Sequence, residues 1–275
     1  MKSETVGKTI AYLRSLYGMT QKQLADSLYV TDKAVSRWER GIGAPDISYL
    51  TKLSIILDTD IETLLDGNLS RFNLKWKGLL FLNYPELITP DTLLFSKRIV
   101  YYQVSFFALA GISDIKIAGK KGDILISQKI LGSGEQYGLK ISYECFDSTF
   151  DKYILSCKEE TGTFLIDGLD FLYGKDVTRS FRRAMYHSSS PVLMKNQQKK
   201  PTAFRFFPPK SLNENTSYQN VQYSNYFFEN GVVSFPIKNT ADLLDASNLM
   251  QLIKKQNSVK IGDLKEIATV RGMIK

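Results

Sequence analysis

Residues 5–67 carry closely spaced helix start and stop signals, and these signals leave few folds open to the chain. Apolar residues recur at helical spacing in short runs, and Gly18, Gly41 and Gly43 stop two of these runs. Thr20 and Gln23 form a capping box for the second helix, and Thr31 can cap the third. Similar signals open the fourth and fifth helices, at Pro45-Asp46 and at Thr59 with Glu62. The segment therefore predicts a compact bundle of five short helices.

Three stretches of this segment carry a family resemblance. They are residues 18–25 (Gly-Met-Thr-Gln-Lys-Gln-Leu-Ala), residues 30–41 (Val-Thr-Asp-Lys-Ala-Val-Ser-Arg-Trp-Glu-Arg-Gly) and Pro45-Asp46. Together they resemble the lambda-repressor-like helix-turn-helix domains of the Cro/CI, xenobiotic-response-element (XRE) type. The resemblance covers the whole of residues 5–67. It implies that the third helix enters the major groove of double-stranded DNA by its N-terminal end.

The resemblance also implies roles for individual residues. Gln21 would contact a phosphate and fix the register, and Thr31 and Arg40 would lie near phosphates. The residues expected to face base edges are Asp32, Lys33, Ser36 and Arg37. Arg37 and Lys33 carry donors that suit guanine, and Asp32 can accept from cytosine. Arg14 and Glu39 match a structural ion pair of the family and are not counted as DNA contacts.

Two features of this region depart from the simplest expectation. Tyr29 stands where the family often has glycine in a left-handed conformation, at a cost of about 1 kcal/mol. Residues 1–70 have a net charge of −1, whereas the rest of the chain has +9, which predicts modest nonspecific DNA affinity. The alternative to a DNA-binding domain is a protein-binding helical bundle that has lost contact with DNA. We disfavour it because Lys33, Ser36 and Arg37 have no packing purpose.

A break in the helical pattern marks the boundary between two domains. Residues 68–75 break the helical pattern, which predicts a linker between a domain at 1–67 and a second domain at 76–275. Hydrophobic residues make up 43% and charged residues 23%, typical of a globular protein. No apolar run approaches the ~18 residues of a membrane span, and the start lacks the apolar stretch of a signal peptide. Only Cys145 and Cys157 could form a disulfide, which favours reduced, partly buried thiols in a cytoplasmic protein.

Strand and helix patterns alternate in the second domain. The expected strands are 76–82, 112–117, 139–143 and 164–167, and the expected helices are 99–110, 124–131 and 177–186. This alternation predicts an α/β, Rossmann-like domain with a parallel sheet and helices on both faces. The chain as a whole is then a multidomain protein, with an all-α domain before an α/β domain.

A stretch of about forty residues, 97–139, carries a second family resemblance, which runs without gaps. This stretch and several others in the second domain resemble sugar-phosphate nucleotidyltransferases, among them the glucose-1-phosphate thymidylyltransferases. Residues 168–174 sit where that family has a Gly-Asp-Asn strand end, and 231–246, 248–250 and 262–267 resemble its closing strand and C-terminal helices. The resemblance implies the family's fold. It is weakest at 191–230, where the chain looks shortened.

The catalytic features of that family are missing at the matching positions. Such enzymes need a glycine-rich phosphate loop followed by Arg and Lys, and two carboxylates that hold Mg²⁺. The loop after the first strand, residues 83–87, has no glycine, and its Pro85 has no N–H. Leu169 replaces one metal carboxylate, and the second position falls near Pro236. The base-reading loop at 144–149 lacks the family's Pro-x-Gly pattern, and Lys97 matches a scaffold lysine.

These departures predict a domain with no catalytic residue, no metal and no cofactor. Asp167 and Asp170 could form a shifted metal pair, but their spacing predicts that the intervening residues separate them. A strand-end aspartate and a turn or cap aspartate is the better interpretation. His187 is the only histidine, so the sequence offers no histidine relay or histidine cluster.

Residues 175–210 hold nine Lys/Arg against one acid, with aromatic residues interleaved. A phosphate-bearing ligand, an auxiliary contact with the DNA backbone and a solvated basic loop all remain open for this segment.

The sequence as a whole predicts a cytoplasmic, DNA-binding transcription regulator. Since such domains bind palindromic operators as dimers, residues 76–275 are expected to form a homodimer. The vestigial cleft is expected to sense a nucleotide, sugar phosphate or nucleotide sugar. Two alternatives stay open. One is an active nucleotidyltransferase with an atypical site, regulated by the helix-turn-helix domain, and the other is a pure interaction module.

Overall fold

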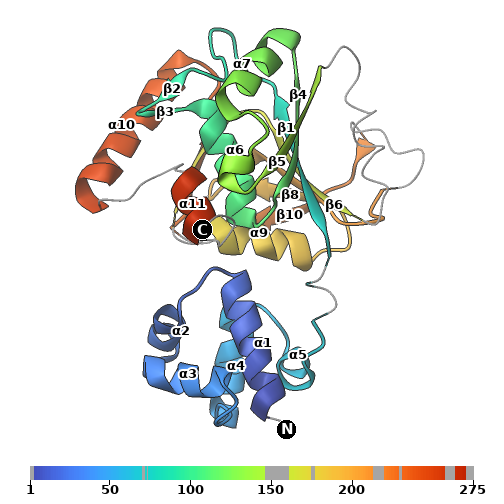
Figure 1. Ribbon diagram of the computed structural model, residues 1–275, viewed down its shortest axis with the longest axis vertical. Coiled ribbons are helices and arrows are strands. Elements are labelled where there is room, and N and C mark those ends of the chain that lie inside the picture. The colour runs from blue at the N-terminus through green and yellow to red at the C-terminus, as the bar shows by residue number, and fades with distance from the viewer. Residues whose placement is uncertain are drawn as a thin grey trace. The chain divides into compact units, whose positions relative to one another are not determined.

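A computed structural model describes residues 3–69, 72, 74–145, 161–174, 177–212, 220–228, 231–257 and 264–270. The chain divides into two compact units, Met1–Leu74 and Lys75–Lys275. Figure 1 traces the elements of each unit. None of the helices in the described ranges combines the length and the apolar character needed to span a membrane.

The first unit is a bundle of short helices around an aliphatic core. The helices are α1 (Ser3–Leu16), α2 (Gln21–Leu28), α3 (Asp32–Glu39), α4 (Ile47–Ile56) and α5 (Ile61–Asp66). Val6, Ile10 and Leu13 form the buried stripe of α1. Phe72 is also buried, and its backbone oxygen accepts a hydrogen bond from the Tyr12 hydroxyl at 3.3 Å. The core of the first unit therefore includes Phe72, which follows the last helix in the sequence.

Most of the predicted helix caps are confirmed, and one is wrong. The Thr20 hydroxyl accepts from the Gln23 N–H at 3.1 Å, and the Gln23 side chain accepts from the Thr20 N–H at 2.7 Å. Thr31 caps α3 as expected. The fifth helix is capped by Asp60 and not by Thr59, because Asp60 accepts from the Thr63 N–H at 2.6 Å. The helix starts one residue later than predicted, which moves the cap by one position.

The second unit is built on one seven-stranded sheet with the order β10-β8-β9-β6-β1-β4-β5. Its strands are β1 (Trp76–Leu82), β4 (Asp114–Gly119), β5 (Lys140–Cys145), β6 (Gly162–Asp167), β8 (Val192–Lys195), β9 (Pro201–Phe207) and β10 (Ser224–Phe227). The four predicted strands pair in parallel, in the order β6-β1-β4-β5. The expectation of a wholly parallel sheet is wrong, since β9 runs antiparallel to both β6 and β8.

Helices cover one face of this sheet. The predicted helices are present as α6 (Ile99–Ala110), α7 (Lys121–Leu131) and α9 (Val177–Tyr186), and in Figure 1 they lie together in front of the strands. The other face, which includes Leu79 and Leu165, packs in the described part of the chain against Leu212, Val221 and Tyr223. The prediction of helices on both faces is therefore wrong for the described residues.

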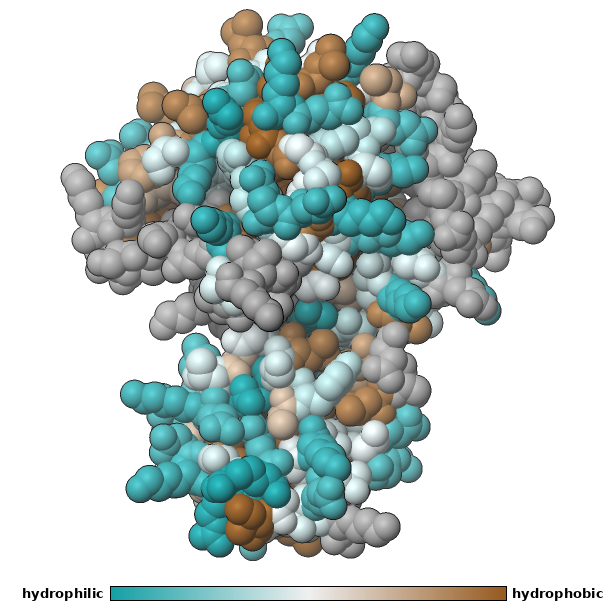
Figure 2. Space-filling model, viewed as in Figure 1, coloured by the Kyte–Doolittle hydropathy of each residue, from teal (hydrophilic) through white to brown (hydrophobic). Residues whose placement is uncertain are grey.

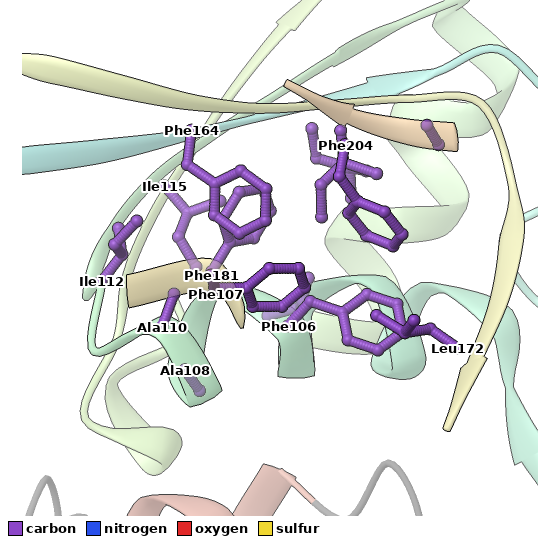
Figure 3. Close-up of a cluster of buried hydrophobic side chains, with 14 of the residues drawn as sticks. Phe106, Phe107, Ala108, Ala110, Ile112, Ile115, Phe164, Leu172, Phe181 and Phe204 are labelled. Atoms are coloured by element: carbon purple, nitrogen blue, oxygen red, sulfur yellow. The ribbon is translucent and has the colours of Figure 1, made fainter. Parts of the chain in front are cut away.

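The main core lies between α6, α9 and the sheet, and phenylalanines dominate it (Figure 3). Phe164 of β6 stacks on Phe206 of β9, with ring centroids 4.3 Å apart. It also contacts Phe107 of α6 and Phe181 of α9, each with centroids 5.0 Å apart. Because rings from three separate parts of the chain meet at Phe164, the antiparallel strand β9 is part of the core.

Two small sheets and a long helix lie beside the main sheet. β7 (Asp170–Tyr173) pairs antiparallel with β11 (Val233–Pro236), and β2 (Leu93–Leu94) pairs with β3 (Lys97–Arg98). Helix α10 (Thr240–Asn257) contacts β2, next to which the Phe95 N–H donates to the Ser247 hydroxyl at 3.2 Å. A short helix, α11 (Leu264–Val270), contacts α6.

The two cysteines were expected as partly buried thiols. Cys145, at the end of β5, is a free thiol and is exposed, so the expected burial is wrong for this residue. Cys157 lies outside the described residues.

Candidate DNA-binding surface and second-domain cleft

The turn between α2 and α3 closes in a left-handed conformation at Tyr29. Its φ is 58° and its ψ is 42°, as predicted for the position that favours glycine. The Tyr29 N–H points back to the backbone oxygens of Ala25 and Asp26, and the side chain is 89% exposed. The ring therefore adds no packing that would offset the backbone strain.

One face of α3 is locked against the rest of the first unit. Val35 and Trp38 are buried, and the Trp38 ring packs against Tyr49 with centroids 5.8 Å apart. Gly7 of α1 lies so close that a Cβ there would sit 2.0 Å from the Trp38 backbone oxygen. This close approach fixes which side of α3 faces outward.

A cluster of hydrogen-bonded and charged side chains links the end of α1, the start of α2 and the end of α3. The Arg14 guanidinium donates to both carboxylate oxygens of Glu39, at 2.5 and 3.0 Å, and to the Met19 backbone oxygen at 2.7 Å. The expected structural ion pair is thus present. The Gln21 amide also donates to Glu39, at 2.8 Å. Glu39 therefore sets the orientation of Gln21 at the start of α2.

The outward side of α3 carries the residues expected to contact DNA. Thr31, Asp32, Lys33, Arg37 and Arg40 are exposed, and Ser36 is half-buried. Asp32 accepts from the Lys33 N–H at 2.8 Å, and Arg40 donates to the Ser36 backbone oxygen at 3.2 Å. Within the described residues, neither the Lys33 ammonium nor the Arg37 guanidinium has a hydrogen-bond or ion-pair partner. These two cations are available to a ligand.

The second unit has a cleft of about 470 Å³ at the carboxyl ends of β1 and β6. Residues 83–85 line it from the loop after β1, and residues 167–170 from the turn between β6 and β7. Residues 201–203 and Arg205 line it from β9, and residues 236–238 from the end of β11. This edge is where ligands bind in open α/β sheets.

Two carboxyl groups and two cations meet in the cleft. Arg205 pairs with Asp167 at 3.7 Å, and Asp170 accepts from the Ala203 N–H at 2.9 Å. Burial raises the pKa of Asp170 to about 6, against the opposing effects of the Ala203 hydrogen bond, Arg205 and Lys238. Asp167 and Asp170 both line the cleft, as do Gly168 and Leu169 between them, and the two carboxyl groups have different partners. Near neutral pH the cleft holds nearly balanced charge.

The residues in the cleft do not fit a divalent metal centre. Leu169, which stands in place of a metal carboxylate, is 5% exposed and packs in an apolar cluster with Phe171 and Ile237. Pro236, near the second expected position, pairs with Asp170 across β11 and β7. Among the described residues, no three or more His, Cys, Asp or Glu side chains are grouped so that they could hold a metal ion.

A buried glutamine, which the sequence interpretation missed, ties the loop after β1 to the cleft. The Tyr84 hydroxyl donates to Gln103 of α6 at 2.5 Å, and the Gln103 amide donates to the Gly168 backbone oxygen at 2.9 Å. Burial raises the pKa of Tyr84 well above its usual value. Gln103 is the one amide side chain of a largely apolar helix, and that is the signal that could have identified it.

The basic residues of 175–210 are divided among several places. Arg205 lines the cleft, whereas Arg182 is buried beside the end of α6, where a Cβ on Gly111 would sit 2.0 Å from its guanidinium. Lys199 and Lys200 are exposed on the hairpin between β8 and β9. Lys175 and its neighbour Asp176 lie outside the described residues.

The helix-turn-helix family matches residues 10–64 of this chain. An 82-residue stretch is 34% identical to YonR, an HTH-type transcriptional regulator derived from the SPbeta prophage of Bacillus subtilis strain 168. That stretch covers 30% of this chain and 72% of YonR. The chain belongs to the helix-turn-helix transcriptional regulators. Its first unit is of the XRE type, with the capped α2–turn–α3 geometry described above.

The second unit of this regulator has a different set of relatives. A stretch of 116 residues is 28% identical to a glucose-1-phosphate thymidylyltransferase of Neisseria meningitidis, over 40% of each chain. A crystal structure from Bacillus anthracis, described as a glucose-1-phosphate thymidylyltransferase, aligns with a TM-score of 0.53 and 12% identity. The alignment covers 70% of this chain and 99% of the Bacillus anthracis chain. The second unit therefore has the nucleotidyltransferase-like fold.

The regulator spans only part of some relatives. It covers two fifths of the Neisseria enzyme, and 27% of the HTH-type transcriptional activator BcrR of Enterococcus faecalis, to which it is 42% identical over 55 residues.

Proposed function

We propose that this regulator binds a specific sequence of double-stranded DNA as a homodimer in the cytoplasm, with α3 in the major groove. The observation that carries the proposal is the two-sided character of α3. Its inner face is locked by Val35, Trp38 and the close approach of Gly7, while Lys33 and Arg37 stand outward without partners in the described structure. A rigid helix that presents such donors suits base readout in a groove.

Each contact residue has its own role in this proposal. Lys33 and Arg37 donate to guanine, Ser36 contacts a base edge, and Gln21, Thr31 and Arg40 contact phosphates. Asp32 uses one carboxylate oxygen to accept from the Lys33 N–H. Its other oxygen remains for a cytosine amino group.

Footprinting on the DNA upstream of the regulator's own gene tests this proposal. We expect a protected inverted repeat with the wild type and, with Arg37→Ala, an affinity loss of about 1–3 kcal/mol that relaxes specificity at one base pair. Lys52→Ala, which removes an exposed cation from α4, is the matched control and should leave protection unchanged. Measurement at two salt concentrations separates base contacts from phosphate contacts, since only the latter change the salt slope. No protection, or equal protection by Arg37→Ala, would contradict the proposal.

We further propose that the second unit does not transfer nucleotidyl groups and instead dimerises the protein and senses a nucleotide, sugar phosphate or nucleotide sugar. Leu169 and Pro236 at the expected metal positions support the loss of transfer, and the retained cleft supports sensing. A pyrophosphate-release assay with Mg²⁺ tests the first point, and robust turnover would refute it. Calorimetric titration with a panel of these ligands tests the second, and no heat with no melting shift across the panel would refute it.

A further inference from the structure

Helix α10 has leucines on a face that nothing in the described structure covers. Its inner face contributes Ala246 and Met250, both buried, to the apolar cluster that also contains Leu169. On its outer face Leu244 is 61% exposed and Leu252 is 57% exposed. The helix lies at the edge of the second unit (Figure 1), and Figure 2 shows hydrophobic side chains at the surface in this part. A helix with apolar residues on two faces is typical of one that is buried on both.

The exposed residues are arranged symmetrically about one position. Leu244, Asn248 and Leu252 follow each other at intervals of four, so they lie along one line of the helix surface. Asn248, in the middle of this line, is exposed. Turning the helix end over end about Asn248 exchanges the two leucines, which is the condition for a self-complementary contact.

We propose that α10 pairs antiparallel with α10 of a second copy of the chain. Leu244 of each copy then packs against Leu252 of the other, and the two Asn248 side chains meet on the two-fold axis. This is an isologous contact, the kind that closed dimers use. An asparagine amide carries both donors and an acceptor, so two copies can hydrogen-bond to each other and fix the register. The inference rests on the proposed homodimer and names the surface that forms it.

The charge distribution along α10 favours this orientation. The first half of the helix carries Asp242 and Asp245, and the sequence of the second half carries Lys254 and Lys255. In an antiparallel pair the acidic half of one helix lies beside the basic half of the other, whereas a parallel pair would place like charges together.

Sedimentation analysis of the full chain tests the surface. We expect a concentration-dependent dimer that Leu244→Asp or Leu252→Asp weakens by about tenfold or more. Leu125→Asp, the same change at a 49% exposed leucine of α7, is the control and should leave the dimer intact. A wild type that is monomeric at every concentration would overturn both this inference and the proposed homodimer. A dimer that survives Leu244→Asp and Leu252→Asp would overturn this inference alone.

A charge-swap pair tests the register. Because Asn248 is proposed to meet its own copy, Asn248→Asp and Asn248→Lys should each self-associate less well than the wild type through like-charge repulsion. Mixing the two variants should restore association as a heterodimer. Circular dichroism spectra like that of the wild type would show that both variants are folded. Failure of the mixture to associate better than either variant alone would overturn the antiparallel register.

Discussion

Gly7→Ala is the most direct perturbation of the contact that orients the recognition helix. A Cβ at residue 7 would lie 2.0 Å from the Trp38 backbone oxygen and 3.2 Å from the Glu39 backbone oxygen. Ordinary contact begins at 3.4 Å, so α1 and α3 would have to separate by about 1.4 Å. The obstructing atoms are backbone atoms of α3, and no side-chain rotation can move them away.

Two opposing effects decide whether Gly7→Ala stabilises or destabilises the first unit. Alanine in a helix interior is favoured over glycine by about 1 kcal/mol, whereas overpacking a tight contact costs typically 1–3 kcal/mol. A displacement as large as the one required belongs at the upper end of that range. We therefore expect a net loss of about 2 kcal/mol, which for a domain of this size lowers the melting temperature by roughly 8–16 °C.

The unfolding of the first unit can be followed by the fluorescence of Trp38 in a Trp76→Phe background, since the chain has only two tryptophans. Gly43→Ala is the control, because a Cβ at residue 43 would meet nothing within 4 Å, and it should change stability by less than about 0.5 kcal/mol. If Gly7→Ala were as stable as the wild type or more stable, as helix propensity alone requires, the close-approach argument would be refuted.

Three further changes test other parts of the structure. Arg14→Ala should destabilise the first unit by about 3 kcal/mol, because it leaves the carboxylate of Glu39, which is 7% exposed, without its cation; a loss below about 1 kcal/mol in the same fluorescence assay would be inconsistent with this. Since burial raises the pKa of Asp170 from 3.8 to about 6, this group should favour the folded state below pH 3.8, and up to about 3 kcal/mol of that stabilisation should be lost as the pH rises to 6. Asp170→Asn should remove that part of the pH dependence in denaturation measured between pH 4 and 7, and an unchanged slope would count against it. Tyr29→Asn should raise the stability of the first unit by up to about 1 kcal/mol, because asparagine tolerates the left-handed conformation and the Tyr29 ring is exposed; a decrease would argue that the ring makes a contact.

The first unit was predictable because its signals are local. Thr20 with Gln23, and Thr31, act within three residues of themselves, and the structure has each cap where the sequence places it. The error at Thr59 has the same origin, because Asp60 is an equally good capping residue one position later. Which of two neighbouring caps is used depends on where the packed helix begins, and spacing alone does not contain that information.

The second unit was predictable only where strands alternate with helices. Strand β9 (Pro201–Phe207) lies in the basic segment 175–210, where the sequence pattern predicts no strand between 187 and 210, yet most of its side chains are buried. Its place in the sheet comes from pairing with β6, some forty residues earlier, and from the stacking of Phe206 on Phe164. Such nonlocal pairing leaves no periodic trace in a short strand.

The candidate DNA-binding residues could be named from the sequence because they follow a motif with fixed spacing. Only part of the cleft could be predicted from the sequence. The sequence predicts the missing carboxylates at Leu169 and near Pro236, but it does not predict that Asp167 and Asp170 both line one cavity. This arrangement depends on the turn at Gly168, where the backbone has a φ of 102°, and on Arg205, which a different part of the chain brings to the cleft. Likewise, the charges of Asp245 and Lys255 can be related to a dimer contact only once α10 is known to have an uncovered face.

The packing around Leu169 gives a physical route from the cleft to the proposed dimer contact. Leu169 and Ile237 line the cleft and belong to the same apolar cluster as Ala246 and Met250 on the inner face of α10. A close-packed cluster of this kind transmits displacement because it has no space to absorb it. A ligand that prefers one position of Leu169 would therefore favour one position of α10, and its differential affinity sets how far the equilibrium moves. Since α10 is proposed to carry the dimer contact and a palindromic operator requires two copies, such a ligand would change DNA affinity through dimerisation, without touching α3.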